Sequence, residues 1–150
     1  MTNNNLDTKD LRILDLLQEN GKYSSYHIAK KTGFPVTTIY HRIRELEKQG
    51  IIRGYTVILD KKKMGLALTA YMLAHYDIAL SGKEPEKKML DKQLRGLSGV
   101  EEIKYLTGRF DLLLKLRVRD LEALNTLLAS VRKIIGVGRT ETFLVLEEVK

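Results

Sequence analysis

The 150-residue sequence contains no cysteine, and this absence excludes several classes of chemistry. Without a thiol the chain has no disulfide, no thiolate metal ligand and no cysteine nucleophile. It also lacks an apolar run near the roughly 18 residues that a membrane-spanning helix needs. Its first ten residues, MTNNNLDTKD, have neither the basic nor the apolar region of a secretory signal. We therefore expect a soluble, cytoplasmic protein with no membrane partner.

Residues suited to catalysis or metal binding are equally sparse. The three histidines are isolated along the chain, at His27, His41 and His75. Two adjacent carboxylate pairs, Glu101-Glu102 and Glu147-Glu148, fall in segments typical of strands, where neighbouring side chains point to opposite faces. Neither pair is therefore expected to act on one bond, as the two carboxylates of a glycosidase do. We predict that the protein is not an enzyme and holds no metal or cofactor.

Positive charge is concentrated in the first part of the chain. Residues 1–63 hold 12 Lys and Arg against 7 Asp and Glu, whereas residues 64–150 hold 14 against 12. The first part therefore carries +5 of the net charge of +7. A field of this sign suits a polyanion, most simply nucleic acid, although a basic surface without a partner has the same charge.

The pattern of residues 1–52 predicts three helices in quick succession. Asp7 is suited to begin the first helix and Asn20-Gly21 to end it, while Ser24 and Gly33 bound a short second helix. After Pro35 a third helix is expected to run to Gln49, and its core stripe at i, i+4 and i+7 is Ile39, Ile43 and Leu46. A short helix, a glycine-containing turn and a longer helix are what a helix-turn-helix requires, although an ordinary helical bundle shares this pattern.

The outward face of the third helix carries residue types that contact DNA. Helical geometry places Thr37, Tyr40, His41 and Arg44 opposite the core stripe, with Thr38 and Arg42 at the flanks. Hydroxyl and guanidinium groups bond to base edges in the major groove or to phosphates. These six residues are the predicted DNA-binding set, and a solvated helix face is the alternative.

Residues 51–59 are rich in Ile, Tyr, Thr and Val and predict a strand, and residues 53–64 as a whole form the expected strand and hinge linker. The second domain, residues 65–150, alternates apolar and polar residues over 66–78, 100–106, 112–118 and 139–149. Helical patterns occupy 84–97 and the segment after Asp120, whose expected apolar stripe is Leu121, Leu124, Leu128, Val131 and Ile135. Each helix is followed by Gly-Val, at Gly99-Val100 and Gly136-Val137, which is a weak internal repeat.

The order βαββαβ predicts a ferredoxin-like domain, in which two helices cover one face of a four-stranded antiparallel sheet. The fold class is therefore α+β. The second face of the sheet carries Tyr71, Leu73 and Leu113, which favour burial against a second subunit. Lys115, Arg117 and Arg119 also belong to this face, so a solvated surface is the alternative.

The turn at residues 107–111 is the one place in this domain where backbone donors, a hydroxyl and a carboxylate converge. Free N–H groups around Gly108 suit a carboxylate, and Asp111 suits an ammonium group, so the turn fits a small zwitterion. An Asp in a hairpin turn also commonly bonds to its own backbone, and this is the alternative.

Three stretches of the chain carry a family resemblance. They are Leu6-Asp7 with Asp10 and Ile13-Leu14; the run from Ile39 through Arg42-Ile43, Leu46-Glu47 and 49–52 to Gly54-Tyr55; and Thr107-Gly108 with Asp111, 120–122, Gly136-Val137, Thr140, Thr142 and 146–149. In this order they resemble the Lrp/AsnC family of bacterial and archaeal transcription regulators, and the resemblance covers essentially the whole chain. The chain differs from the family at Pro35 and Val36, where the family usually has Ser and Pro, and at Arg109, which adds a charge that many relatives lack.

The resemblance implies a winged helix-turn-helix joined to an ACT-like (RAM) sensor domain, with dimers formed through the sheets and often assembled further, up to octamers. It also implies an amino-acid effector, held near Thr107, Gly108, Arg109 and Asp111 and near Thr140 and Thr142. The function predicted is therefore a sequence-specific regulator that binds palindromic double-stranded DNA as a homodimer or higher oligomer. A metabolite-binding sensor that acts through protein contacts is the alternative.

Overall fold

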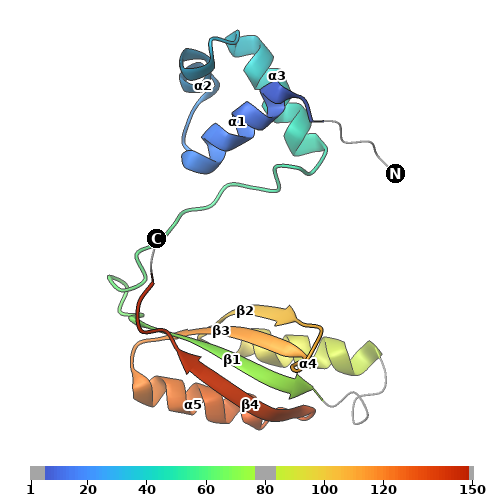
Figure 1. The fold of residues 1–150 in the computed structure, drawn as a ribbon, viewed down its shortest axis with the longest axis vertical. Helices are drawn as coiled ribbons and strands as arrows, with labels where there is room; N and C mark the ends of the chain where they lie inside the picture. The colour runs from blue at the N-terminus through green and yellow to red at the C-terminus, as the bar shows by residue number, and fades with distance from the viewer. Residues whose placement is uncertain (1–5, 77–83, 149–150) are drawn as a thin grey trace. The chain divides into compact units, whose positions relative to one another are not determined.

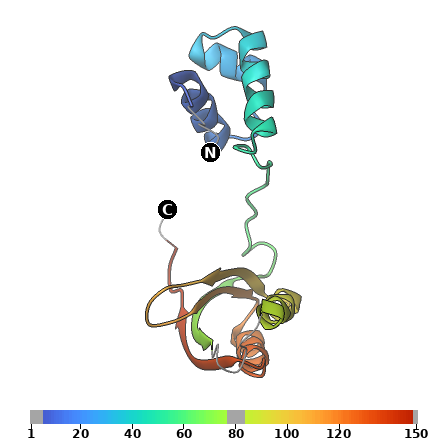
Figure 2. The ribbon, with the colours of Figure 1, turned by 90° about the vertical axis from the view of Figure 1, so that its right-hand side faces the viewer.

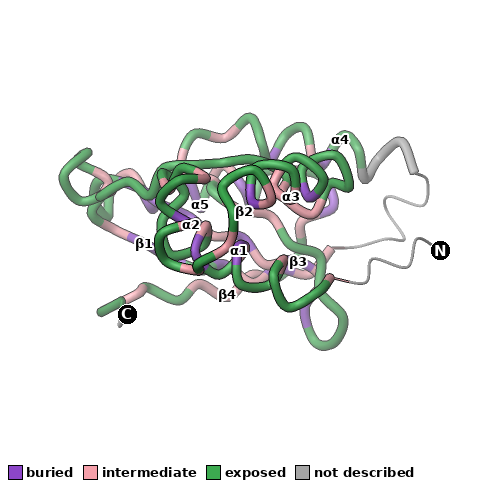
Figure 3. The backbone as a smooth tube through the Cα atoms, turned by 90° about the horizontal axis from the view of Figure 1, so that it is seen from above, coloured by how far each residue is buried: buried purple, intermediate pink, exposed green. Residues whose placement is uncertain are grey.

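The computed structural model of the chain describes residues 6–76 and 84–148, and the chain divides into two compact units, Met1–Ile58 and Leu59–Lys150 (Figure 1). The first unit is helical and the second is built on a sheet. Figure 3 marks the buried positions along the backbone of both. Within the described ranges, no helix is long and apolar enough to cross a membrane.

The first unit consists of three helices: α1 (Thr8–Glu19), α2 (Ser25–Thr32) and α3 (Val36–Lys48). Each helix contributes to one small core, whose fully enclosed members are Ile13, Leu16, Ile28 and Ile39. Ile43 packs partly buried against this core, and Leu46 is buried further along α3. The predicted stripe of α3 is therefore confirmed.

Local hydrogen bonds explain where these helices begin and end. The carboxylate of Asp7 accepts from the backbone N–H groups of Lys9 and Asp10, and the hydroxyl of Ser24 accepts from that of His27. Gly33 ends α2 with φ of 75°, a left-handed conformation that glycine adopts without a steric penalty. Pro35, in contrast, precedes α3 without a side-chain hydrogen bond to cap it.

The strand predicted over residues 51–59 is not formed. None of these described residues belongs to a helix or a strand. Apolar β-branched composition favours a strand, but a strand also needs a hydrogen-bonded neighbour, and residues 51–59 pair with no strand in the described part of the chain. Instead, the N–H groups of Ile51 and Ile52 donate to the carbonyl of Leu46, and the Tyr55 hydroxyl donates to Glu47 over 3.1 Å.

The second unit has the predicted βαββαβ order: β1 (Leu68–Tyr76), α4 (Glu84–Gly96), β2 (Val100–Tyr105), β3 (Leu112–Val118), α5 (Leu121–Arg132) and β4 (Val137–Leu144). All pairings are antiparallel, and the sheet order is β2-β3-β1-β4. Figures 1 and 2 show that both helices cover one face of the sheet. The predicted strand ends at residues 77–78 and at 149 lie outside the described residues.

The buried core of this unit follows the predicted alternation of the strands. Ala70, Met72 and Ala74 of β1 lie beside Leu112, Leu114 and Leu116 of β3, and all six are fully buried. The stripe predicted for α5 is partly wrong, because Leu121 and Ile135 are 58% and 87% exposed. Leu121 is the first residue after the Asp120 cap, and Ile135 follows the last turn, so neither reaches the sheet. Leu127 completes the buried stripe instead.

The repeated Gly-Val has a steric cause. Gly99 and Gly136 both follow a helix and have positive φ angles of 101° and 91°. A Cβ atom on Gly99 would lie 2.9 Å from Leu127, and one on Gly136 would lie 2.8 Å from the ring of Tyr76. The chain therefore passes too close to its neighbours, in too unusual a conformation, for a side chain at either position.

Candidate DNA-binding face and effector turn

The outer face of α3 presents most of the predicted DNA-binding residues together. Thr37, Tyr40, His41 and Arg44 are exposed and Thr38 is half-buried, whereas Ile39 on the opposite side is completely buried. The guanidinium of Arg44 lies 6.0 Å from the centre of the Tyr40 ring. One side of the helix thus offers hydroxyl, aromatic and cationic groups to a partner.

Arg42 differs from this set. Its Nη1 atom lies 2.7 Å from Oδ2 of Asp7 and 2.8 Å from Oδ1 of Asp10, both at the start of α1. The hydrogen bond to Asp10 is the largest cause of a raised pKa for Arg42. The pKa of Asp7 is lowered, first by the hydrogen bond from the backbone N–H of Asp10 and further by Arg42. The long side chain of Arg42, at a flanking position of α3, therefore reaches the neighbouring helix α1. Its contact with DNA stays a prediction.

A hollow of about 400 Å³ lies beside this face of α3. Tyr40 and Arg44 line it together with Tyr55, which follows α3 along the chain. Burial is the first cause of a raised pKa for Tyr55, and its hydrogen bond to Glu47 is the second. The start of the linker is thus held against the helical unit by a hydrogen bond and by packing.

Asp111 ties the predicted effector turn to the end of β1. Its carboxylate accepts a hydrogen bond of 2.9 Å from the backbone N–H of Tyr76, and its own N–H donates to the carbonyl of Ala74. The same carboxylate oxygen lies 3.7 Å from Nδ1 of His75, whose ring packs against Phe110 with centres 4.8 Å apart. The Asp111 carboxylate therefore bonds across to a neighbouring strand, while the Asp111 carbonyl accepts from the N–H of Leu106 on the other side of its own turn.

The tip of the turn is open. Thr107, Gly108 and Arg109 are exposed, and a Cβ atom on Gly108 would meet nothing within 4 Å. The guanidinium of Arg109 lies 3.6 Å from the carboxylate of Glu141 on β4, and that of Arg139 lies 3.5 Å from the same oxygen. His75 and Glu141 are the neighbours that the sequence alone did not identify, because only the sheet register brings them to the turn.

Thr140 and Thr142 lie on the other face of the sheet. They stand opposite Ala74 and Met72, both of which belong to the core beneath the helices. Residues directly opposite on antiparallel strands share a face, so these two threonines face the helices, whereas Glu141, opposite Leu73, does not. Thr140 accepts a hydrogen bond from Arg132 of α5. The six predicted effector residues therefore do not form one pocket within the described part of the chain.

The second face of the sheet carries both apolar side chains and ions. Tyr71 and Phe143 are cross-strand neighbours and are 37% and 52% exposed. Arg117 of β3, opposite Thr69 of β1, is nearly buried and donates hydrogen bonds to Glu101 and Glu148. This face thus carries both apolar and charged groups, and its burial against a second subunit stays a prediction.

The predicted separation of Glu101 from Glu102 is wrong. The strand register shifts between Val100 and Glu102, as in a β-bulge, and both carboxylates lie within 4 Å of the Lys115 ammonium, at 3.8 and 3.5 Å. A bulge breaks the alternation on which the prediction depended. Both groups are engaged by cations, and among the described residues no cluster of three or more metal-ligating side chains occurs.

Both units match families of known proteins. Residues 6–53 match the model of a winged helix-turn-helix DNA-binding domain, and residues 78–150 match the Lrp/AsnC ligand binding domain. The leucine-responsive regulatory protein of Haemophilus influenzae is 37% identical over 150 residues, which cover 99% of this chain and 88% of that protein.

This chain belongs to the Lrp/AsnC family. The leucine-responsive regulatory protein of Escherichia coli K12 is 35% identical over 147 residues, covering 97% of this chain and 87% of its own length. A crystal structure of a transcriptional regulator of Neisseria meningitidis with L-methionine superimposes with a TM-score of 0.87 at 26% identity, covering 97% and 92% of the two chains. AsnC of E. coli gives 0.80 at 25% identity, covering 95% and 93%.

The chain is accordingly an Lrp-type transcription regulator, with a helix-turn-helix DNA-binding domain and a ligand-binding domain. This assignment confirms the predicted family, the α+β fold class and the function class.

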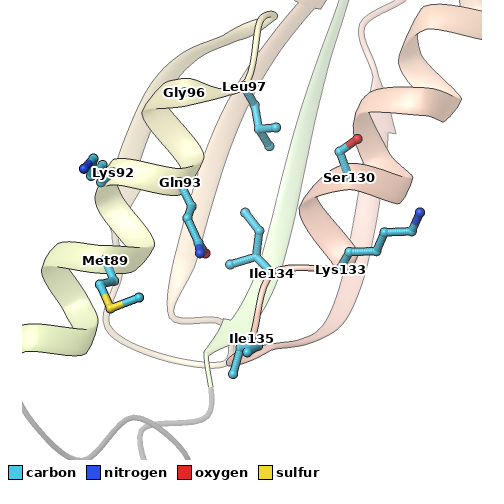
Figure 4. A pocket seen from close by; sticks show the side chains of 9 residues that line it. All are labelled: Met89, Lys92, Gln93, Gly96, Leu97, Ser130, Lys133, Ile134 and Ile135. Atoms are coloured by element: carbon cyan, nitrogen blue, oxygen red, sulfur yellow. The ribbon is translucent and has the colours of Figure 1, made fainter.

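This Lrp/AsnC chain also has a groove of about 710 Å³ between α4 and α5, and none of the residues predicted for the effector lines it (Figure 4). Leu97 and Ile134 point into the space between the two helices, and Lys92 and Lys133 point away from each other on its two sides. Met89, Gln93, Gly96, Ser130 and Ile135 complete the lining. The groove is apolar inside with ammonium groups beyond its rims.

Proposed function

We propose that the protein regulates transcription by inserting α3, its recognition helix, into the major groove of a specific DNA site. The contact residues are the members of the predicted set that are not paired with the carboxylates of α1: Thr37, Thr38, Tyr40, His41 and Arg44. The observation that carries this proposal is that these groups share one side of a helix whose other side, at Ile39 and Leu46, is buried in the core. A helix fixed on one side presents the other in a constant orientation.

Each group has a role that its chemistry defines. The Arg44 guanidinium donates to the two acceptors of a guanine or to a phosphate, and the Tyr40 ring at 6.0 Å restricts where it points. The hydroxyl groups of Thr37 and Thr38 can donate a hydrogen bond to a base acceptor or to a phosphate oxygen. A good bidentate contact to a base contributes about 1–3 kcal/mol of discrimination against the wrong base.

The protein acts as a homodimer, or a higher oligomer built from dimers, in this proposal. The exposed pair Tyr71 and Phe143 and the partly exposed Leu73 and Leu113 form an apolar area on the uncovered face of the sheet. Burial of such an area against a second copy removes it from water. A two-fold axis then predicts an inverted-repeat DNA site, with half-sites separated by multiples of roughly 10 base pairs.

An amino acid, bound at the turn of residues 107–111, is the proposed effector. The open tip around Gly108 accommodates a carboxylate, and the Asp111 carboxylate, 39% exposed, remains accessible to an ammonium group. A related regulator from Neisseria meningitidis was crystallised with L-methionine, which supports this ligand class. Because Thr140 and Thr142 face the helices, we confine the contact set to Thr107, Gly108, Arg109 and Asp111.

The DNA-binding proposal is tested by selecting genomic fragments with the purified protein at physiological salt and footprinting the enriched DNA. We expect a palindromic site, and we expect Arg44→Ala to relax base preference at one position by about 1–3 kcal/mol. Arg12→Ala removes the same charge from an exposed position on α1 and serves as the matched control. An Arg44→Ala variant with the sequence preference of the parent would refute the proposed contact face. Random recovered fragments with a steep salt dependence would leave only nonspecific binding.

The effector proposal is tested by thermal shift with each amino acid. A true effector at 100 times its dissociation constant stabilises the protein by about 2.7 kcal/mol. Asp111→Asn keeps an oxygen that can accept from the Tyr76 N–H but loses the charge, so we expect it to abolish the shift. Asp15→Asn, at an exposed position on α1, is the control. A full shift in the Asp111→Asn variant would place the ligand elsewhere, with the groove between α4 and α5 as the next candidate.

A further inference from the structure

We propose that Arg42 is a positioning residue, which fixes the recognition helix α3 against the start of α1 and does not contact DNA. This inference rests on the proposed role of α3 in DNA recognition. In this proposal Arg42 contacts the protein's own helix α1 and not the DNA. DNA binding then also depends on Asp7 and Asp10, which lie at the start of α1.

The contact is short and partly sheltered. One nitrogen of the guanidinium, Nη1, carries two hydrogens and lies 2.7 Å from Asp7 and 2.8 Å from Asp10. The side chain of Arg42 is 30% exposed and that of Asp10 only 15%. Charge-assisted hydrogen bonds of this length are stronger than neutral ones. The arrangement is therefore a defined joint between two helices and not a loose surface ion pair.

The two carboxylates are fully occupied, and each oxygen has its own task. Oδ1 of Asp7 accepts from the N–H groups of Lys9 and Asp10, and Oδ2 of Asp10 accepts from the N–H of Asp7. These bonds form the capping box that begins α1. The remaining oxygens, Oδ2 of Asp7 and Oδ1 of Asp10, hold Arg42. The capping hydrogen bonds hold both carboxylates in the orientation that Arg42 contacts, so the joint is preorganised.

The joint holds the middle of α3, a helix whose start has no side-chain cap. Its N-cap residue is Pro35, which makes no side-chain hydrogen bond to the helix. Arg42 lies between Tyr40, His41 and Arg44 in sequence, in the centre of the proposed contact residues. A recognition group must be held within roughly 0.5 Å by the residues behind it, so a tie at this position limits both rotation and sliding of the helix.

The same geometry argues against a phosphate contact. To reach DNA, the guanidinium would have to leave two charge-assisted hydrogen bonds. It would also leave two carboxylates unneutralised close to the approaching phosphates, and like charges repel. Arg44, which is exposed and holds no carboxylate in the described part of the structure, has neither obstacle.

The test measures affinity for the selected operator and for nonspecific DNA over a range of salt concentrations. We expect Arg42→Ala to weaken operator binding by about tenfold, the equivalent of one misplaced base contact. The two freed carboxylates should lower nonspecific affinity much less than operator affinity. The dependence on salt should match that of the parent, because no phosphate contact is lost. A reduction of the salt slope by about 0.9, with equal weakening on both DNAs, would identify Arg42 as a phosphate contact and overturn the proposal. Unchanged operator affinity would overturn it as well.

Asp10→Asn keeps Arg42 but removes one of its partners, and the two roles considered for Arg42 predict opposite changes in operator affinity. If Arg42 positions α3, this variant loses operator affinity as Arg42→Ala does, and the double variant is no worse than either single one. If Arg42 contacts DNA, removing a negative charge that holds it should raise the affinity. Arg12→Ala controls for the loss of one positive charge. If the unmodified protein selects no DNA sequence, the proposed function itself is overturned. If it selects an operator and the Asp10→Asn variant binds that operator more tightly, only the role of Arg42 is overturned.

Discussion

Gly99 is the position at which the smallest change should disturb the ligand-binding unit most. Its φ of 101° is one that residues with a side chain rarely adopt. An added Cβ atom would lie 2.9 Å from Cδ2 of Leu127, 3.1 Å from the carbonyl oxygen of Arg117 and 3.1 Å from Cγ1 of Val118. The backbone cannot easily withdraw, because the carbonyl of Gly99 accepts a 2.8 Å hydrogen bond from the N–H of Arg117.

Two costs add up in Gly99→Ala. The backbone conformation costs an L-residue about 1–2 kcal/mol. Forcing an extra methyl group into a packed region costs about 1–3 kcal/mol more. We therefore expect the free energy of unfolding of the ligand-binding unit to fall by about 2–5 kcal/mol. Gly136→Ala should cost less, because its nearest neighbour is the ring of the half-buried Tyr76, which can turn aside.

The assay is urea unfolding of the full chain, followed by far-ultraviolet circular dichroism. Gly96→Ala is the matched control, since Gly96 lies in α4, a Cβ atom there meets nothing within 4 Å, and alanine favours a helix. The expected order of stability is Gly96→Ala, then Gly136→Ala, then Gly99→Ala. A Gly99→Ala protein within about 0.5 kcal/mol of the Gly96→Ala protein, the usual range of a neutral surface change, would refute the steric argument.

Two further changes test single groups. The pKa of Asp7 is lowered from its ordinary value of 3.8, so its charge stabilises the fold at neutral pH, and this contribution is lost as pH falls through the folded-state pKa. Asn also caps helices, so Asp7→Asn removes the charge but keeps a cap. Urea titrations should find Asp7→Asn less stable than the parent at pH 7, with the difference closing as pH falls below the ordinary Asp value of 3.8; a gap that stays constant would contradict this. Thr142 has a buried Oγ1 with no hydrogen-bond partner in the described residues. Thermal unfolding should therefore find Thr142→Val more stable than the parent by about 1 kcal/mol or more, with the effector shift kept. A loss of stability would instead reveal a partner for that hydroxyl.

Periodicity and capping residues predicted most of the fold. Spacing of i, i+4 and i+7 identified Ile39 and Leu46 as core, and strict alternation identified the buried side of β1. Asp7, Ser24 and Asp120 cap the helices that they were predicted to begin. These signals depend on neighbours within one turn or one strand, and a single sequence contains them completely.

Predictions failed where an element needed a distant partner or reached its own end. Residues 51–59 have the composition of a strand, but composition does not supply the neighbouring strand that makes one. Ile135 continues the spacing of α5, but the helix has already ended at Arg132. Glu101 and Glu102 lie on one face because the register shifts at β2, which alternation does not foresee.

Tertiary neighbours that the sequence did not indicate also surround two of the candidate site residues. Arg42 has the residue type and the flanking position of a DNA contact, and its ion pair with Asp10, 32 residues earlier, is the observation from which we propose a positioning role instead. Thr142 was placed with the effector turn by resemblance, and only the register that sets it opposite Met72 moves it to the helical side. In both cases the residue type was informative about chemistry, and the tertiary partner decided whether that chemistry faces a ligand or holds the protein together. The variants of Arg42, Asp10 and Asp111 therefore separate recognition from support within the same small set of polar groups.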